Sequence, residues 1–175
     1  MKMNIKDLEK LPLMGILRGV PSTGISPLIE TVIEAGLKTI EITMNTPGAP
    51  QLIRSAIKAA SGRISVGAGT VIKEDDLDAA LDAGAGFIVM PACSEKITAR
   101  CVKEKVPVFP GAFTPQEVLN AWRAGAAMVK VFPCGLFGPR YIKELKGPFD
   151  SIRLMAVGGV RLENIGEYFA AGADA

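Results

Sequence analysis

The sequence contains no histidine among its 175 residues. This absence excludes Ser-His-Asp and Cys-His nucleophilic sites, and it removes the commonest zinc ligand. The proton carriers and nucleophiles that remain are the side chains of Lys, Glu, Asp, Cys and Tyr. Any catalytic site in this chain is therefore built around an amine, a carboxylate, a phenol or a thiol.

Cysteine and unbalanced charge are also scarce. The three cysteines are an odd number without CxxC spacing, which argues against a disulfide framework or a zinc knuckle and fits a reducing cytoplasm. The 20 basic and 18 acidic residues form no basic run with interleaved aromatic residues of the kind that nucleic-acid grooves use. The N-terminal stretch has acidic residues before a short apolar run, so it predicts neither a signal peptide nor a membrane span. We expect a cytoplasmic protein whose partner is a small molecule, with no nucleic-acid or membrane partner.

Short apolar runs with strand character recur along the chain. The composition, 49% hydrophobic and 22% charged, suits a globular protein, and we expect one domain over residues 1–175. Helical spacing that ends in glycine separates several of the runs, as in residues 27–36, 74–84, 114–125 and 162–172. This alternation predicts an α/β fold with seven strands, over residues 12–18, 38–44, 63–69, 86–91, 106–111, 127–133 and 152–159.

An Ala-Gly pair precedes a strand four times, ending at Gly36, Gly84, Gly125 and Gly172. Each pair alone is a plain helix stop, but the spacing of 41 to 48 residues equals two β/α units. The pattern predicts a (β/α)8 TIM barrel and not an open doubly wound sheet, because no GxGxxG fingerprint follows the first strand. Since the fourth pair lies close to Ala175, we expect a barrel truncated before strand eight, with unpaired edges on its first and last strands.

A lysine interrupts one of the apolar strands. Period-2 alternation places Met128, Lys130 and Phe132 on one face and Val129 and Val131 on the other. If helices cover the valine face, Lys130 points into the barrel near the C-terminal end of its strand, where barrel enzymes have their active sites. A solvated lysine on an edge strand is the alternative.

Three further polar residues lie at strand ends. Arg18 ends the first strand, Glu41 points inward opposite Ile40 and Ile42, and Thr70 follows the third strand at the rim. We expect these side chains to converge on Lys130. The alternative is a structural ion-pair network of the three charged groups, with Thr70 as the N-cap of the next helix.

A buried lysine, a carboxylate and an arginine suggest one chemistry. Burial lowers the pKa of an amine, and the free amine can attack a ketone to form a Schiff base. A carboxylate can then move protons, and Arg18 can hold a substrate carboxylate by a bidentate pair. These residues indicate a class I aldolase that acts on a 2-keto acid without a metal or another cofactor.

The chain also resembles the 2-keto-3-deoxy-6-phosphogluconate (KDPG) and 4-hydroxy-2-oxoglutarate (KHG) aldolase family, which is class I. The resemblance implies a Schiff base at Lys130, proton transfer by Glu41, substrate contacts from Arg18 and Thr70, and a homotrimer. It also implies that Pro91 and Phe132 line the pyruvate pocket. The motifs that carry it, in family order, are "ILRG" (16–19), "IEITMNTP" (40–47), "GAGTV" (67–71), "FIVMP" (87–91), "VKVFP" (129–133), "FGPRYIKELKGPF" (137–149) and "VGGV" (157–160).

Two glycines after the last predicted strand suit a phosphate site. Barrels often bind phosphate at the loops after strands seven and eight, so Gly158 and Gly159 are candidates, with a plain turn as the alternative. The family's other phosphate contact, a Gly-Ser after strand eight, falls beyond Ala175.

Asn45 and Val157 depart from the gluconate-type pattern, which has arginine and threonine there, and resemble the branch that acts on the galactonate epimer (KDPGal). Val157 cannot donate a hydrogen bond to a substrate hydroxyl, and both epimers stay open. The resemblance implies a lyase of Entner-Doudoroff-type carbohydrate metabolism that cleaves KDPG or KDPGal to pyruvate and glyceraldehyde 3-phosphate, with KHG as a further substrate. The alternatives are a phosphate-binding barrel isomerase or decarboxylase, and a non-catalytic sugar-phosphate-binding fragment.

Overall fold

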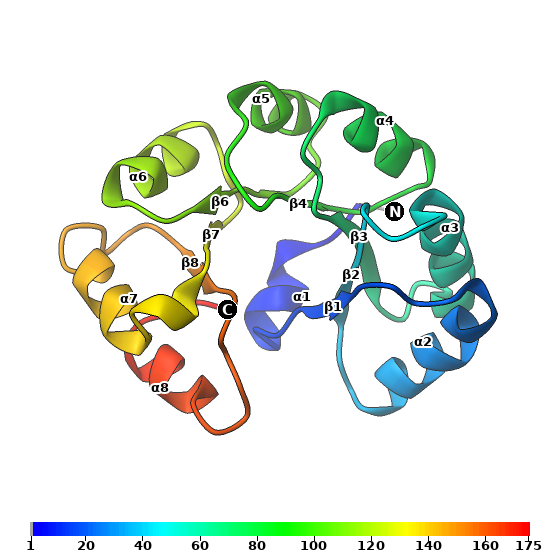
Figure 1. Cartoon of the computed structure of the whole chain (residues 1–175), viewed down its shortest axis with the longest axis horizontal. Helices are drawn as coiled ribbons and strands as arrows, with labels where there is room; N and C mark the ends of the chain where they lie inside the picture. Colours follow the sequence, from blue (N-terminus) through cyan, green and yellow to red (C-terminus); the bar gives the residue numbers. More distant parts are fainter. Residues whose placement is uncertain (1) are drawn as a thin grey trace.

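The computed structural model describes residues 2–175, in which parallel strands alternate with helices. Figure 1 shows the strands inside a ring of helices. The strands are β1 (Gly15–Leu17), β2 (Thr39–Thr43), β3 (Ser65–Gly69), β4 (Ile88–Val89), β5 (Val108–Phe109), β6 (Gly111–Ala112), β7 (Val129–Val131) and β8 (Leu154–Ala156). The α-helices are α1 (Ile5–Lys10), α2 (Ile25–Glu34), α3 (Ala49–Ala60), α4 (Glu74–Asp82), α5 (Glu95–Lys103), α6 (Pro115–Arg123), α7 (Pro139–Lys146) and α8 (Ile165–Ala170), and the short 3-10 helices are η1 (Ser22–Gly24) and η2 (Cys134–Leu136).

The strands follow one another in chain order, as a barrel requires. Strands β1 to β5 form one parallel sheet and β6 to β8 another. The prediction of seven strands was wrong in one respect, because the strand expected over residues 106–111 is divided into β5 and β6 at Pro110. Proline has no N–H to donate to a ladder. Its carbonyl still accepts from the Lys130 N–H at 2.9 Å, so the two sheets continue each other.

The glycines predicted to stop four helices do so. Gly36, Gly84, Gly125 and Gly172 each follow a helix C-cap and have φ between +85° and +101°. Glycine adopts this left-handed conformation without the steric cost that a Cβ brings. None of the helices in residues 2–175 combines the length and the apolar character that crossing a membrane needs.

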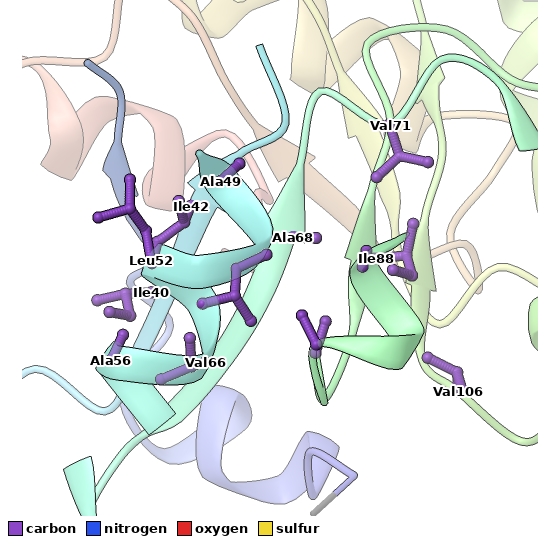
Figure 2. Packing of buried hydrophobic residues seen from close by; sticks show 14 of the residues in the cluster. Ile40, Ile42, Ala49, Leu52, Ala56, Val66, Ala68, Val71, Ile88 and Val106 are labelled. Carbon is purple, nitrogen blue, oxygen red and sulfur yellow. The ribbon is translucent and has the colours of Figure 1, made fainter. Parts of the chain in front are cut away.

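Two apolar layers lie on opposite sides of the strands. On the outside, Ile40 and Ile42 of β2 pack against α3, where Leu52 and Ala56 face them (Figure 2). On the inside, a separate cluster contains Phe87, Phe109 and Met128, together with Leu8 of α1, a helix that the sequence analysis did not predict. The alternation on β2 therefore turns Glu41 toward the barrel interior, as expected.

The two ends of the barrel wall differ from the expectation. The last strand, β8, was expected to have an unpaired edge, and this was wrong: the Asp174 N–H donates to Leu154 O and the Ala156 N–H to Ala175 O, both at 2.8 Å. The Asp174 carboxylate anchors this segment, because it accepts from Lys146 Nζ and from the Leu154 N–H at 2.8 and 2.9 Å. Within residues 2–175, β1 pairs only with β2, as expected, and a cleft of about 310 Å³ lies between β1 and β8. Strand β8 corresponds to the seventh predicted strand, over residues 152–159, and truncation before an eighth predicted strand stays a prediction.

Candidate active site

Lys130 lies in the barrel interior, on β7. Its neighbours Val129 and Val131 are fully buried in the outer apolar layer, so the lysine points inward, and it is only 7% exposed. Its Nζ lies 5.1 Å from the centroid of the Phe132 ring. Burial lowers the pKa of Lys130, Glu41 opposes this shift, and the positive charge of Arg18 adds to it. The edge-strand alternative is therefore wrong. The lowered pKa means that a larger share of this amine is uncharged than in an exposed lysine.

Glu41 is the carboxylate of the site and is 2% exposed. Burial raises its pKa to about 6, against the opposing charges of Lys130 and Arg18. Its Oε2 finds no hydrogen-bond donor within residues 2–175. Gly69 on the adjacent strand makes room for it, because a Cβ there would lie 2.4 Å from Glu41 Oε1. A carboxyl group with this pKa and a free oxygen can both accept and return a proton near neutral pH.

Arg18 and Thr70 meet at the rim, where Arg18 Nη2 donates to Thr70 Oγ1 at 3.4 Å. Thr70 has φ of +55°, which is uncommon for a residue other than glycine. The expectation that Thr70 could cap the next helix was wrong, since α4 begins after Lys73. The ion-pair alternative also fails: among the residues that the structure describes, neither Arg18 nor Lys130 forms a salt bridge with Glu41.

Phe132 and Pro91, the two residues expected to line the pyruvate pocket, lie close together. Both line a cleft of about 330 Å³, and Phe132 is 37% exposed. Gly158 lies under the Phe132 ring, and a Cβ at this glycine would be 3.2 Å from the ring carbons. Val157 lies on the inward face of the wall, against the inner apolar cluster. The cleft that Phe132 and Pro91 share is lined by polar as well as apolar residues, and neither Lys130 nor Glu41 lines it.

The tandem glycines have a packing role in addition to any binding role. Gly158 and Gly159 both have φ of +84°, and a Cβ at Gly159 would lie 2.6 Å from the Cα of Gly135. Gly135 donates its N–H to Gly158 O at 2.7 Å. The N–H groups of Gly158 and Gly159 themselves have no acceptor within residues 2–175. They are therefore available to an anion.

The four polar residues predicted to converge lie in one site, because Arg18 contacts Thr70 and its charge acts on both Glu41 and Lys130. Two groups that support them were not predicted from the sequence: Gly69, which accommodates Glu41, and Thr46, whose hydroxyl accepts from the Gly19 N–H beside Arg18. A glycine facing an inward carboxylate and a threonine three residues after the strand end were the only signals. All three cysteines are free, and residues 2–175 contain no group of His, Cys, Asp or Glu side chains arranged to hold a metal ion.

Known proteins are similar in sequence to this chain over almost its whole length. The family model described as KDPG and KHG aldolase matches residues 5–175. The 2-dehydro-3-deoxy-6-phosphogalactonate aldolase of Escherichia coli K12 is 39% identical over 164 residues, which are 93% of this chain and 80% of that protein. The 2-dehydro-3-deoxy-phosphogluconate aldolase of Pseudomonas aeruginosa is 34% identical over 166 residues, 94% of this chain and 74% of that protein.

A solved structure also matches the fold. The structure described as native KDPGal superimposes with a TM-score of 0.91 and 36% identity, and the match covers 99% of this chain and 83% of that chain. The sequence comparisons and the structural comparison thus point to the same group of aldolases. This chain belongs to the KDPG and KHG aldolase family.

Proposed function

We propose that this protein is a class I aldolase that cleaves a 6-phosphorylated 2-keto-3-deoxy sugar acid to pyruvate and glyceraldehyde 3-phosphate. The observation that carries the proposal is a buried lysine and a buried carboxylate inside one barrel, where each shifts the pKa of the other and the charge of Arg18 acts on both. The relatives named as KDPGal and KDPG aldolases support it. They do not favour the isomerase, decarboxylase or non-catalytic alternatives.

The reaction begins at Lys130. Its uncharged amine attacks the carbonyl at carbon 2 of the substrate, and loss of water gives an iminium ion. The lowered pKa of Lys130 increases the share of the uncharged form. Arg18, exposed at the rim and bonded to Thr70, holds the substrate carboxylate beside the reacting carbon.

Glu41 then carries the proton. It takes the proton of the hydroxyl at carbon 4 as the bond between carbons 3 and 4 breaks, and the electron pair moves into the iminium to form an enamine. Glyceraldehyde 3-phosphate leaves. The same carboxyl group returns the proton to carbon 3, and hydrolysis releases pyruvate and the lysine. A pKa of about 6 suits both transfers near neutral pH.

The phosphate group is assigned to the loop after β8. The N–H groups of Gly158 and Gly159 point to no protein acceptor within residues 2–175, which supports a role in binding an anion. Val157, directly before them, offers no hydroxyl to the substrate. Both the gluconate and the galactonate epimer are therefore assay substrates.

Borohydride reduction in the presence of pyruvate tests the proposal. Peptide mapping by mass spectrometry is expected to find one reduced pyruvate adduct, on Lys130. Lys130→Met should abolish it, together with cleavage of both sugar acids. Lys143→Met, which removes an exposed lysine on α7, is the matched control and should leave both unchanged. An unmodified wild-type protein, or an adduct on Lys143, would contradict the assignment.

We also propose a homotrimer that works in the cytoplasm. The family resemblance supports the trimer, as do Leu136 and Phe137, which are 68% and 61% exposed near the mouth of the barrel. The three free cysteines suit a reducing compartment. Light scattering coupled to gel filtration is expected to give three times the chain mass, and a monomer at working concentrations would contradict the trimer.

A further inference from the structure

A small hydrogen-bonded chain lies behind the rim of the site and is not part of the chemistry described above. Thr46, 4% exposed, accepts from the Gly19 N–H at 3.0 Å. Its hydroxyl also lies 3.0 Å from the hydroxyl of Thr43, which is fully buried. Three segments meet here: the turn after β1, the end of β2 and the turn that follows β2.

One end of this chain determines the position of Arg18. Gly19 directly follows Arg18, and its φ of +68° turns the backbone immediately after that residue. The bond from the Gly19 N–H to Thr46 Oγ1 ties this peptide to the turn that follows β2. Within residues 2–175, the guanidinium itself makes one hydrogen bond, from Nη2 to Thr70 Oγ1 at 3.4 Å.

The other end is connected to the strand that carries Glu41. Thr43 lies two residues after Glu41 on the same face of β2, and it pairs in register with Gly69, the residue that accommodates the Glu41 carboxylate. Thr46 is itself held by its backbone, because its N–H donates to Thr43 O at 2.9 Å and its carbonyl accepts from the Ala49 N–H at 3.1 Å. The hydroxyl of Thr46 is thus placed by two backbone bonds.

Removing the Thr46 hydroxyl would leave a hydrogen-bond donor without its acceptor. The Thr46 oxygen accepts the Gly19 N–H and also bonds with the Thr43 hydroxyl, and either hydroxyl can donate in that bond. Without it, the Gly19 N–H loses its acceptor, and a partly buried unpaired amide drives the turn to move. That movement displaces the side chain of Arg18. It leaves Lys130 in place on β7, and burial, the main cause of its lowered pKa, is unchanged.

We propose that Thr46 is a positioning residue that holds Arg18 over the substrate carboxylate. This inference rests on the function proposed above, in which Arg18 binds that carboxylate and Lys130 forms the Schiff base. It predicts a selective defect, in which binding of the carboxylate is weakened and the reactivity of the lysine is preserved. A general disturbance of the barrel would affect both.

The test compares Thr46→Val with Thr46→Ser and with Thr39→Val. Thr39 is a matched control on the same strand as Glu41, since it is fully buried and its hydroxyl has no partner within residues 2–175. Borohydride trapping at Lys130 is measured against the concentration of pyruvate, and in parallel against pyruvamide, in which an amide replaces the carboxylate. Thermal unfolding confirms that each variant is folded.

The expected result is a change in one quantity only. Thr46→Val should raise the half-saturating pyruvate concentration about tenfold, with the same maximal trapping rate and the same response to pyruvamide as the wild type. Thr46→Ser and Thr39→Val should match the wild type for both probes. In the full reaction, the change in Thr46→Val should fall mainly on KM.

With folded Thr46→Val, either a wild-type pyruvate response or an equal loss for pyruvate and pyruvamide would overturn the inference. If Thr46→Val does not fold, Thr43→Val removes the other end of the chain and should raise the half-saturating pyruvate concentration less, in the same direction; no change there also overturns the inference. A wild-type protein that traps neither probe contradicts the proposed function itself, which distinguishes the two failures.

Discussion

Adding one methyl group at Gly69 should disable proton transfer without preventing Schiff-base formation. A Cβ at this position would lie 2.4 Å from Glu41 Oε1 and 2.8 Å from Oε2, whereas ordinary contacts begin at 3.4 Å. The carboxylate therefore retreats by about 1 Å in Gly69→Ala. A misplacement of this size costs a reaction about 10²-fold. Lys130, on a strand from the other sheet, keeps its position.

The assay follows exchange of the pyruvate methyl protons with deuterium oxide by NMR, and it is normalised to the amount of pyruvate trapped on Lys130 by borohydride. Gly69→Ala should trap pyruvate as the wild type does and lose exchange and cleavage about 10²-fold. The control is Gly166→Ala, because a Cβ there meets nothing within 4 Å. Wild-type exchange in folded Gly69→Ala would refute the role of Glu41 as the proton carrier.

Two further predictions concern pH and epimer choice. Burial raises the pKa of Glu41 from 4.5 to about 6, so the folded state holds this proton more tightly than the unfolded chain does. The free energy of unfolding of the wild type, relative to Glu41→Gln, should therefore fall by about 2 kcal/mol as pH rises through this interval, as urea unfolding at about pH 4 and about pH 7 can measure; equal pH dependence in both proteins would contradict it. Val157→Thr, which adds a hydroxyl beside Gly158, should raise the ratio of kcat/KM for the gluconate over the galactonate epimer about tenfold, and an unchanged ratio would remove this position from epimer selection.

Local sequence patterns predicted much of the fold. The alternation of Ile40, Glu41 and Ile42 predicted which side chain faces inward, and the glycines after the helices adopt the left-handed conformation that a helix stop requires. Helix α1 escaped prediction because its six residues contain one fully buried side chain, Leu8, and its position depends on the apolar interior that it closes. The division of one predicted strand at Pro110 depends on strand pairing, because β5 belongs to the sheet of β1 to β5 and β6 to the sheet of β6 to β8.

The residues of the candidate site were recognisable one by one, but their properties were not. The order of residues along each strand placed Arg18, Glu41, Thr70 and Lys130 at the same end of a parallel barrel, because side-chain direction alternates with a period of two and the strands all run the same way. The amino-acid sequence was therefore enough to predict which side chains share the mouth of the barrel.

The behaviour of these groups depends on contacts that form when the chain folds. The pKa of Glu41 rises because neighbouring strands remove water from it, and its position depends on the missing Cβ of Gly69 across the sheet. The contact of Arg18 with Thr70 joins residues 52 positions apart, and the bond from Gly19 to Thr46 joins residues 27 positions apart. Desolvation, steric room and hydrogen bonding depend on which atoms are close in space. Residues far apart in the sequence come close only when the barrel closes, so a local sequence pattern does not contain this information.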